Sequence, residues 1–282
     1  MGLVDRVPAP ALRWAGRQQF RPVIGPLVKL LGARLLHKPR TVAHGQAAGL
    51  LIDPAGAAAG YALGTSEPLI QDLFAAHVPP GGVVWDVGAN IGFYSLIAAR
   101  LVGEGGKVIA FEPLPDNQRA VLRNVELNGL GNVELVALAL SDSEGEAELE
   151  IHDSPTWAKL DTSGDTAFKR DTAASGSVRV EVSTLDAQLA RLPAPQLVKM
   201  DIEGAEVAAL RGASKLLGEC RPALICELHG TNAAVVELLR AHDYEVRAVE
   251  SPEVAPEHAA WHVHVLATPR DAAAGAGGAG AS

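Results

Sequence analysis

Four charged side chains crowd one short segment of the sequence, QLVKMDIEGAEV at residues 196–207. Lys199, Asp201, Glu203 and Glu206 occur where the flanking apolar pattern predicts a buried parallel strand that runs into a helix. Burial of such charges costs several kcal/mol unless the charges are paired or used in chemistry. The segment is therefore a candidate catalytic or binding site.

A second candidate site lies in VVWDVGANIGFYSL, residues 83–96. Gly88 and Gly92 would let a ligand approach the backbone at the start of a helix, an arrangement that suits nucleotide-like cofactors. The spacing D-x-G-x-N-x-G lacks the third glycine of the dinucleotide fingerprint and places Asp86 just before the turn. A carboxylate attracts a cation and repels a pyrophosphate, so this turn favours S-adenosylmethionine, which carries an ammonium and a sulfonium.

Further residues are expected to bind the same cofactor. Glu112 ends the next predicted strand and is expected to accept the ribose hydroxyls, a role that an acid plays for dinucleotides as well. Pro113 and the Ser141–Asp142 pair are expected to flank the adenine. Glu67 either reaches the methionine end or is simply an acid at a helix N-terminus. The full predicted set is Glu67, Asp86, Gly88, Ala89, Asn90, Gly92, Glu112, Pro113, Ser141, Asp142 and Asp201.

The elements that position these residues alternate between strand and helix from about residue 65. Apolar runs predict strands at 83–88, 107–113, 133–142, 197–201, 223–228, 245–250 and 262–269. Helical spacing predicts helices at 64–78, 93–102, 115–129, 205–217 and 232–242. Such alternation is typical of βαβ units and a parallel sheet.

Residues 143–182 interrupt this alternation. Segments 146–152 and 177–183 alternate charged and apolar residues, which predicts a hairpin with one wet face. The long polar connection 153–176, with Trp157 as its large anchor, is either a substrate-contacting element or a surface insertion.

Several stretches, in this order and spacing, resemble the FkbM family of S-adenosylmethionine-dependent methyltransferases: WDVGANIGFYSL, AFEPLPDN, RNVELNG with Asn124 and Asn128, ALSDSEG, STLD and VKMDIEGAEVAALRGA. The resemblance covers about residues 60–250. Met200 departs from the isoleucine or leucine usual in the family, which is a conservative core change.

This resemblance implies an α/β fold of the Rossmann-like class I methyltransferase type. Its seven-stranded sheet is mostly parallel with a reversed last strand, to which this chain adds the inserted β-hairpin and an N-terminal helical extension. The resemblance also implies methyl transfer to oxygen, on a sugar hydroxyl of a glycolipid or polysaccharide or on a secondary metabolite.

In such a sheet the fourth strand lies beside the first and the fifth strand reaches the same edge, so Asp201 is expected next to Asp86 and close to Glu227. Lys199 faces the same side and is interpreted as neutralising these acids or Glu206. The catalytic candidates are Asp201, Glu203, Glu227 and His229, because a carboxylate with a raised pKa or a histidine can take the proton of the acceptor hydroxyl. A histidine bonded to backbone in a turn is the alternative for His229.

No metal site is assigned from the sequence. The acids and the histidine at this edge would suit magnesium, but the sequence has no motif with metal-ligand spacing. Two rival functions stay open: a dinucleotide-dependent oxidoreductase, and a non-catalytic family member that binds cofactor or a partner without turnover.

The net charge of −9 is distributed unevenly along the chain. Residues 1–40 hold eight basic residues and one acid, a net +7, which leaves −16 for the rest. Such an acidic body disfavours nucleic acid as a partner, and a small-molecule or glycan acceptor is expected. Within the basic segment, residues 26–38 predict an amphipathic helix that docks on its own core, on a second subunit of an oligomer, or on an anionic membrane.

The length of 282 residues suits one large α/β domain with extensions. We expect a basic N-terminal extension at 1–45, the methyltransferase domain at 46–269 and a disordered tail at 270–282. The two cysteines, Cys220 and Cys226, do not suggest a disulfide framework, and no signal peptide or membrane-spanning run is predicted. The expected location is the cytoplasm.

Overall fold

The computed structural model describes residues 6–17, 38–55, 57–151, 158–160 and 176–270. Most of the predicted basic helix at 26–38, Trp157 with most of the long connection, and the tail from residue 271 lie outside the described residues. In the N-terminal extension the structure describes one helix, α1 (Ala9–Arg17), which carries an exposed Trp14.

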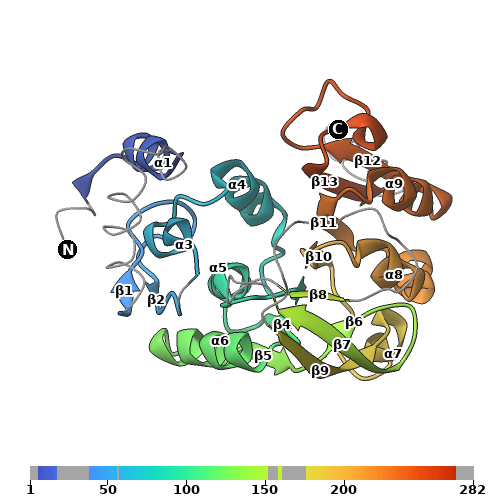
Figure 1. Ribbon diagram of the computed structural model, residues 1–282, viewed down its shortest axis with the longest axis horizontal. Coiled ribbons are helices and arrows are strands. Elements are labelled where there is room, and N and C mark those ends of the chain that lie inside the picture. Colours follow the sequence, from blue (N-terminus) through green and yellow to red (C-terminus); the bar gives the residue numbers. More distant parts are fainter. Residues whose placement is uncertain (1–5, 18–37, 56, 152–157, 161–175, 271–282) are drawn as a thin grey trace, which may run out of the picture.

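A seven-stranded sheet forms the centre of the molecule (Figure 1). Its strand order is β12-β13-β11-β10-β3-β4-β5, and only the pairings of β13 with β11 and β12 are antiparallel among those described. The predicted mostly parallel sheet with a reversed last strand is therefore confirmed. The strands are β3 (Val83–Val87), β4 (Lys107–Phe111), β5 (Val133–Val136), β10 (Leu197–Met200), β11 (Ala223–His229), β12 (Tyr244–Ala248) and β13 (His262–Pro269).

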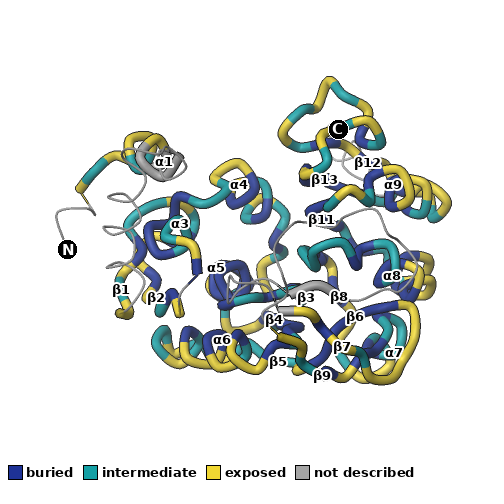
Figure 2. Tube along the Cα trace, in the orientation of Figure 1, coloured by how far each residue is buried: buried dark blue, intermediate teal, exposed yellow. Residues whose placement is uncertain are grey.

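Helices cover both faces of this sheet, because alternate residues of each strand point to opposite faces. Val84 and Leu197 belong to the core under α4 (Pro68–His77), α5 (Phe93–Val102) and α6 (Pro115–Leu127). Trp85 and Val198 belong to the core under α7 (Leu185–Leu189), α8 (Glu206–Arg211) and α9 (Asn232–Ala241). The helices are buried where they meet the sheet and exposed on their outer sides (Figure 2).

A small N-terminal unit packs against the face formed by α5 and α6. It comprises the ribbon β1 (Arg40–Thr41) and β2 (Leu51–Ile52) and the short helix α3 (Ala59–Leu63). Asn124 of α6 and Asn128, the residue that caps the end of α6, accept hydrogen bonds from the backbone N–H groups of Asp53 and Leu51, at 2.6 and 2.8 Å. The spacing of these asparagines places both amides on one helix face, where they hold the ribbon. The ribbon thus begins before residue 46, where the domain was expected to start.

The predicted third strand at 133–142 is divided in two. β5 ends at Val136, and β6 (Ala139–Leu140) leaves the main sheet to pair with β9 (Gly176–Ser183). The predicted hairpin is confirmed by the antiparallel pairing of β7 (Gly145–Ile151) with β9, and β8 (Ala158–Leu160) completes a second sheet in the order β6-β9-β7-β8.

The predicted helix at 205–217 is also divided. α8 ends at Arg211, and a separate π-helical turn, η3, covers Leu216–Cys220. The carboxylate of Asp186 accepts hydrogen bonds from the backbone N–H groups of Lys215 and Leu216, and so caps the second segment. This cap comes from α7, which is distant in the sequence, and it allows a second helical segment to begin after Gly212.

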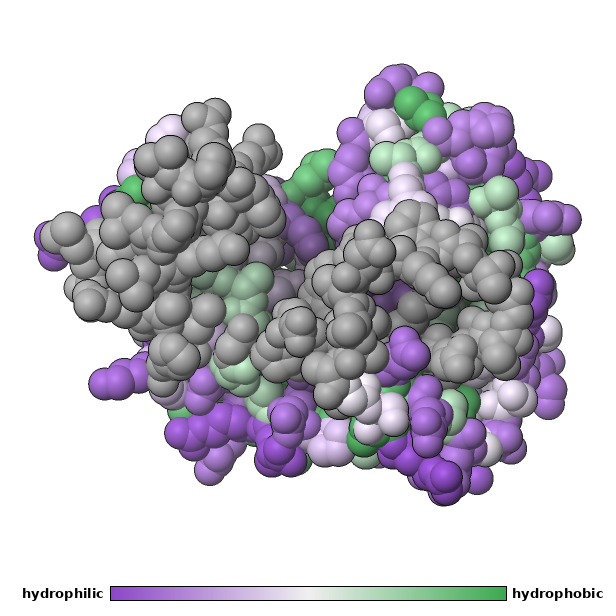
Figure 3. All heavy atoms as spheres, viewed as in Figure 1, coloured by the Kyte–Doolittle hydropathy of each residue, from purple (hydrophilic) through white to green (hydrophobic). Residues whose placement is uncertain are grey.

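No helix in the described ranges has both the length and the apolar character needed to span a bilayer. The described surface on the side shown in Figure 3 is mostly hydrophilic, in line with the acidic charge of the body.

Candidate active site

The turn between β3 and α5 is built on Gly88. Its φ is +83°, in the region that favours glycine, and a Cβ atom at this position would lie 1.9 Å from the carbonyl oxygen of Asp201. The backbone N–H groups of Gly88 and Ala89 both donate to the carbonyl of Phe111. The turn is thereby hydrogen-bonded to the end of β4 and lies close against Asp201, the residue that follows β10.

The expected neighbour of Asp201 needs correction. Asp86 pairs in register with Lys199, so Asp201 lies beside Gly88, two residues beyond Asp86. The Asp86 side chain is buried and accepts a hydrogen bond from the Ser95 hydroxyl at 2.5 Å. Burial raises the pKa of this carboxyl, although Ser95 and the charge of Lys199 oppose the rise. Asp86 thus stabilises the turn through its bond to Ser95 on α5. It does not line the pocket described next.

A pocket of about 680 Å³, including its open part, lies over the carboxyl ends of β3, β4 and β10. One end is apolar and the other carries acids, which fits the adenine and the cationic methionine end of S-adenosylmethionine respectively. The apolar part is lined by Phe111, Leu114, Leu138, Leu140 and Leu149, and the polar part by Gly88, Asn90, Glu112, Asn117, Asp201 and Glu203. Pro113 lies in the lining, as expected.

Glu112, in the polar part of the lining, has its carboxylate held in place by hydrogen bonds. One oxygen accepts a hydrogen bond from the Asn90 N–H at 2.7 Å, and the other accepts from the Leu114 N–H and the Asn117 amide. Burial raises the pKa of Glu112 to about 7. A carboxylate in this orientation is suited to accept the hydroxyls of a ribose.

Six of the eleven predicted cofactor residues do not line the pocket: Asp86, Ala89 and Gly92, which belong to β3 and the turn that follows it, and Glu67, Ser141 and Asp142. The N–H of Ser141 donates to the Ser183 carbonyl and Asp142 is exposed, and neither lines the pocket, because β6 has turned away to join β9. Leu138–Leu140 occupy the position that was expected for them. Glu67 accepts the Tyr94 hydroxyl at 2.8 Å on the α4 and α5 side, near Glu227 and not in the pocket lining.

The catalytic candidates do come together. We call the set of side chains at the carboxyl ends of β10 and β11 and the start of β13 the carboxylate–histidine cluster: Asp201, Glu203, Glu227, His229, His262 and His264. Nε2 of His229 lies 3.5 Å from Glu203, 3.8 Å from Glu227 and 4.0 Å from Asp201. Asp201 and Glu203 also line the pocket, so the cluster adjoins the cofactor region.

The buried charges of Lys199 and Glu206 are both satisfied by nearby polar groups. The ammonium of Lys199 lies 3.8 Å from Asp201 and 5.1 Å from the centre of the Tyr94 ring. Burial lowers the pKa of Lys199, but the negative charges of Asp201 and the surrounding acids raise it by more. The pKa of Lys199 therefore lies above its ordinary value. Glu206 does not pair with Lys199 in the structure.

The buried Glu206 carboxylate instead accepts hydrogen bonds from the Gly204 N–H, Nδ1 of His229 and the Thr231 hydroxyl, at 2.8, 3.0 and 2.9 Å. Since a carboxylate only accepts, Nδ1 of His229 carries the proton and Nε2 is turned toward the cluster.

The charges of the cluster shift the pKa values in opposite directions. Burial raises the pKa of Asp201 well above its ordinary value, and it also raises that of Glu203. Burial would raise the pKa of Glu227 too, but hydrogen bonds from His262 and His264 hold it well below its ordinary range. Burial lowers the pKa of His229, whereas the bond to Glu206 and the nearby carboxylates raise it to about 9.

Two histidines of the cluster were missed from the sequence. His262 contacts an oxygen of Glu227, and Nε2 of His264 lies 3.3 Å from the other oxygen. The antiparallel register of β13 on β11 places His262 opposite His229 and His264 opposite Glu227. The alternation HVHV was the available signal, because it puts both imidazoles on one face of a strand.

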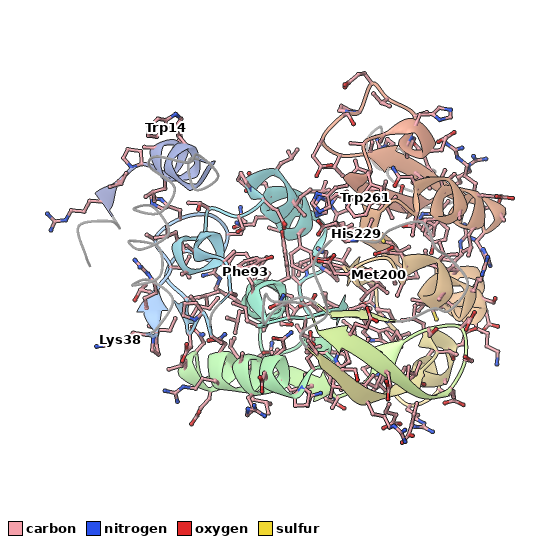
Figure 4. All side chains as sticks on the ribbon, in the orientation of Figure 1. Trp14, Lys38, Phe93, Met200, His229 and Trp261 are labelled. Carbon is pink, nitrogen blue, oxygen red and sulfur yellow. The ribbon has the colours of Figure 1, made fainter. Side chains whose placement is uncertain are left out.

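Trp261 borders the cluster. Its ring meets that of His229 edge to face at 5.9 Å between centres, and both side chains lie on the same side of the molecule (Figure 4). Gly230 makes room for the indole, since a Cβ atom there would lie 2.1 Å from the indole nitrogen.

Three of the six non-glycine residues with positive φ in the described part of the chain lie in this region: Glu67, Asn90 and Glu203, at 44°, 54° and 50°. Such conformations are uncommon outside glycine and gather at functional sites.

The FkbM methyltransferase domain model matches residues 86–246, more than half of the chain. The hexuronic acid methyltransferase AglP of Haloferax volcanii is 32% identical over 151 residues, which cover 52% of this chain and only 56% of that protein. The 31-O-demethyl-FK506 methyltransferase FkbM of Streptomyces tacrolimicus is 30% identical over 203 residues, 61% of this chain and 76% of that protein.

A solved structure of a methyltransferase FkbM from Methylobacillus flagellatus is 18% identical, with a TM-score of 0.42 over 86% of this chain and 60% of that one. S-adenosylmethionine is the methyl donor of the family, and the pocket fits it. The Gly88 turn lacks a pyrophosphate fingerprint, and the sheet has the reversed β13 expected of this fold. Since the domain model also matches more than half of the sequence, the chain belongs to the FkbM family of S-adenosylmethionine-dependent methyltransferases.

Proposed function

We propose that this protein is an O-methyltransferase that acts on a hydroxyl of a sugar, in a glycolipid or polysaccharide, or of a secondary metabolite. The observation that carries the proposal is that Asp201 and Glu203 belong both to the cofactor pocket and to the carboxylate–histidine cluster. Both line the cofactor pocket and both face Nε2 of His229, so acids that can take a proton stand where the donor and an acceptor would meet.

The residues that would hold the cofactor follow from the pocket. Leu138, Leu140 and Phe111 would contact the adenine, Glu112 the ribose, and the Gly88–Asn90 turn with Asp201 the methionine end. S-adenosylmethionine supplies an electrophilic methyl group on its sulfonium, which an acceptor oxygen attacks. Asp86 supports this arrangement through Ser95 and the turn, without itself lining the pocket.

The chain's own residues would prepare the acceptor. A hydroxyl is a weak nucleophile until its proton is being removed, and a carboxylate with a raised pKa is a better base than an ordinary one. Asp201 and Glu203 have such raised pKa values. With a pKa of about 9, His229 holds its proton at neutral pH, so a carboxylate takes the acceptor proton while His229 orients the acids.

One named relative supports oxygen as the acceptor atom, since the Streptomyces protein is described as a 31-O-demethyl-FK506 methyltransferase. AglP, described as a hexuronic acid methyltransferase, supports a sugar-derived acceptor. One acceptor is a sugar acid and the other a natural product, which are the two classes proposed here. Free cysteines, one of them buried, suit the cytoplasm as the site of action.

The test is methylation of a panel of hydroxylated acceptors, namely uronic acids, neutral sugars and polyketide alcohols, with labelled S-adenosylmethionine. We expect S-adenosylhomocysteine to accumulate with an acceptor, and NMR of the product to show a new methoxy group bonded to carbon through oxygen. Methylation on nitrogen or carbon would contradict the proposal. Tight S-adenosylhomocysteine binding without turnover on any acceptor would favour the non-catalytic alternative.

A further inference from the structure

Three imidazoles surround one carboxylate in the carboxylate–histidine cluster. The Nε2 atoms of His229, His262 and His264 all face Glu227. Those of His229 and His262 lie near its Oε1 atom, and that of His264 lies near its Oε2 atom. Ligand atoms of Glu227, His229 and His262 lie within 4.8 Å of one another. A buried carboxylate with several imidazole nitrogens is a donor set typical of divalent transition metals.

The outer contacts of these histidines have the pattern of metal ligands. His229 turns Nδ1 to Glu206 at 3.0 Å, and His264 turns Nδ1 to Glu250 at 2.6 Å. In metal sites a ligating histidine gives its other ring nitrogen to a carboxylate, which sets the tautomer and the ring orientation. Here that contact is made for both buried histidines, and Nε2 is the atom that faces Glu227. Metal binding at Nε2 of His229 would release the proton that this imidazole otherwise holds at neutral pH.

An independent observation concerns His264. Only 3% of this side chain is exposed, and its Nε2 has Glu227 Oε2, 3.3 Å away, as its nearest polar partner, in a geometry too poor for a full hydrogen bond. Buried polar atoms are seldom left poorly satisfied, so a weakly bonded imidazole nitrogen beside Glu227 is consistent with a cation in this region. His264 forms a second candidate group with Glu227 and Glu67 on the Oε2 side.

We propose that Glu227, His229 and His262 bind a divalent transition-metal ion, with Glu206 as the positioning residue for His229. The proposal rests on the proposed function only in placing the acceptor hydroxyl on the open side of the ion. That side is accessible because the His262 side chain is 57% exposed, whereas those of Glu227 and His229 are both 5% exposed.

The position gives the ion a chemical role. Asp201 and Glu203 stand between the cofactor pocket and His229, so an ion at Nε2 of His229 would lie on the acceptor side of the donor. A divalent cation bound to a hydroxyl lowers the pKa of that hydroxyl and orients its oxygen. The neighbouring carboxylates would then receive the proton that the hydroxyl gives up. Magnesium and manganese fit less well than zinc or cobalt, because imidazole nitrogens contribute to the site.

The test uses the full chain, purified without a histidine tag and freed of metal with a chelator. Co²⁺ is titrated in while its visible absorption is followed, and Zn²⁺ is then added as a competitor. We expect a single Co²⁺ site whose spectrum indicates nitrogen and oxygen ligands and which Zn²⁺ displaces. His262→Ala should weaken binding at least tenfold, and Glu206→Gln should weaken it about tenfold by loosening His229.

The matched control is His258→Ala, since His258 is exposed on the 3₁₀ turn η4 (Pro256–His258) outside the cluster. It should bind Co²⁺ as the unaltered protein does. Absence of binding, or equal affinity of the His262→Ala and His258→Ala variants, would overturn the metal site.

The metal result is independent of the acceptor. Metal binding without methylation of any hydroxyl would sustain this inference and refute the proposed function, whereas methylation in a metal-free protein that binds no Co²⁺ would do the reverse.

Discussion

Nδ1 of His229 lies 3.0 Å from a carboxylate oxygen of Glu206, and this buried pair joins the end of β11 to the first turn of α8. The Glu206 carboxylate also satisfies the Gly204 N–H and the Thr231 hydroxyl. Glu206→Ala would leave three donors without their acceptor, and each such loss costs about 1–3 kcal/mol when buried. We expect the free energy of unfolding to fall by about 3 kcal/mol, measured by urea denaturation.

Glu206→Gln keeps an acceptor of the same size and should cost about 1 kcal/mol. The control is Glu237→Ala on the exposed side of α9, which should change stability by no more than about 0.5 kcal/mol. If Glu206→Ala and Glu237→Ala proved equally stable, the buried hydrogen bonds would not hold the two elements together.

The Gly88 turn allows a test that separates backbone strain from overlap. Gly88→Ala would place a methyl group 1.9 Å from the Asp201 carbonyl oxygen in addition to the strain of positive φ. We expect a loss of about 3 kcal/mol in stability together with weaker S-adenosylhomocysteine binding. Gly129→Ala, with φ of +61° and open space around the new Cβ atom, should cost only about 1 kcal/mol in thermal or urea unfolding. Similar losses for both variants would show that the contact with Asp201 contributes little.

Glu112 should make cofactor affinity depend on pH. Its pKa of about 7 means that the carboxyl is protonated in the cofactor-free protein below that value, and a ribose needs the ionised form as acceptor. The affinity for S-adenosylhomocysteine should therefore rise with pH and level off above pH 7. Below pH 7 the affinity should change by up to about tenfold for each pH unit. Calorimetry from pH 5.5 to 8.5 measures this slope. Glu112→Gln should bind more weakly with no slope in this range, and an unchanged slope would assign the titration to another group.

The same group should act in the opposite direction on the stability of the cofactor-free protein. Its pKa is about 7 when folded against 4.5 ordinarily, so the folded state binds this proton more tightly than the unfolded chain does. The contribution is fully present below pH 4.5 and is lost as the pH rises through 7. In urea denaturation, Glu112→Gln should remove this decline relative to the unaltered protein.

Asp201→Asn and Glu203→Gln test the proton acceptors. Each variant keeps the shape of the side chain and loses its basicity, so kcat should fall at least a hundredfold for the residue that takes the proton. Affinity for S-adenosylhomocysteine, measured by calorimetry, should change only a few-fold. Full activity in both variants would remove these carboxylates from the mechanism.

Much of the fold was predictable because it depends on local periodicity. The strands at 83–87 and 107–111 and the helix at 93–102 follow from apolar runs and glycine turns, and their order implies a parallel sheet. What could not be predicted depends on distant partners. The break after Val136 depends on pairing between β6 and β9, and the break after Arg211 depends on the Asp186 carboxylate.

The site was predictable to the same extent. Asp201, Glu203, Glu227 and His229 could be found because strand ends in a parallel sheet meet at one edge. His262 and His264 were missed because their contribution depends on the register of an antiparallel strand, which pairs His229 with His262. Ser141 and Asp142 were assigned to the adenine from a strand that the structure shows to end earlier.

The departure of β6 from the main sheet has a consequence for the pocket. Leu149 from the inserted hairpin and Leu138–Leu140 from the segment leading into it wall the apolar end of the pocket, whereas the acids stand on the central strands. The apolar wall and the acids are therefore contributed by segments that are separate in the sequence. If the nucleobase binds at the apolar end, as proposed, substitutions at Leu138, Leu140 and Leu149 would alter donor affinity without changing Asp201 or Glu203.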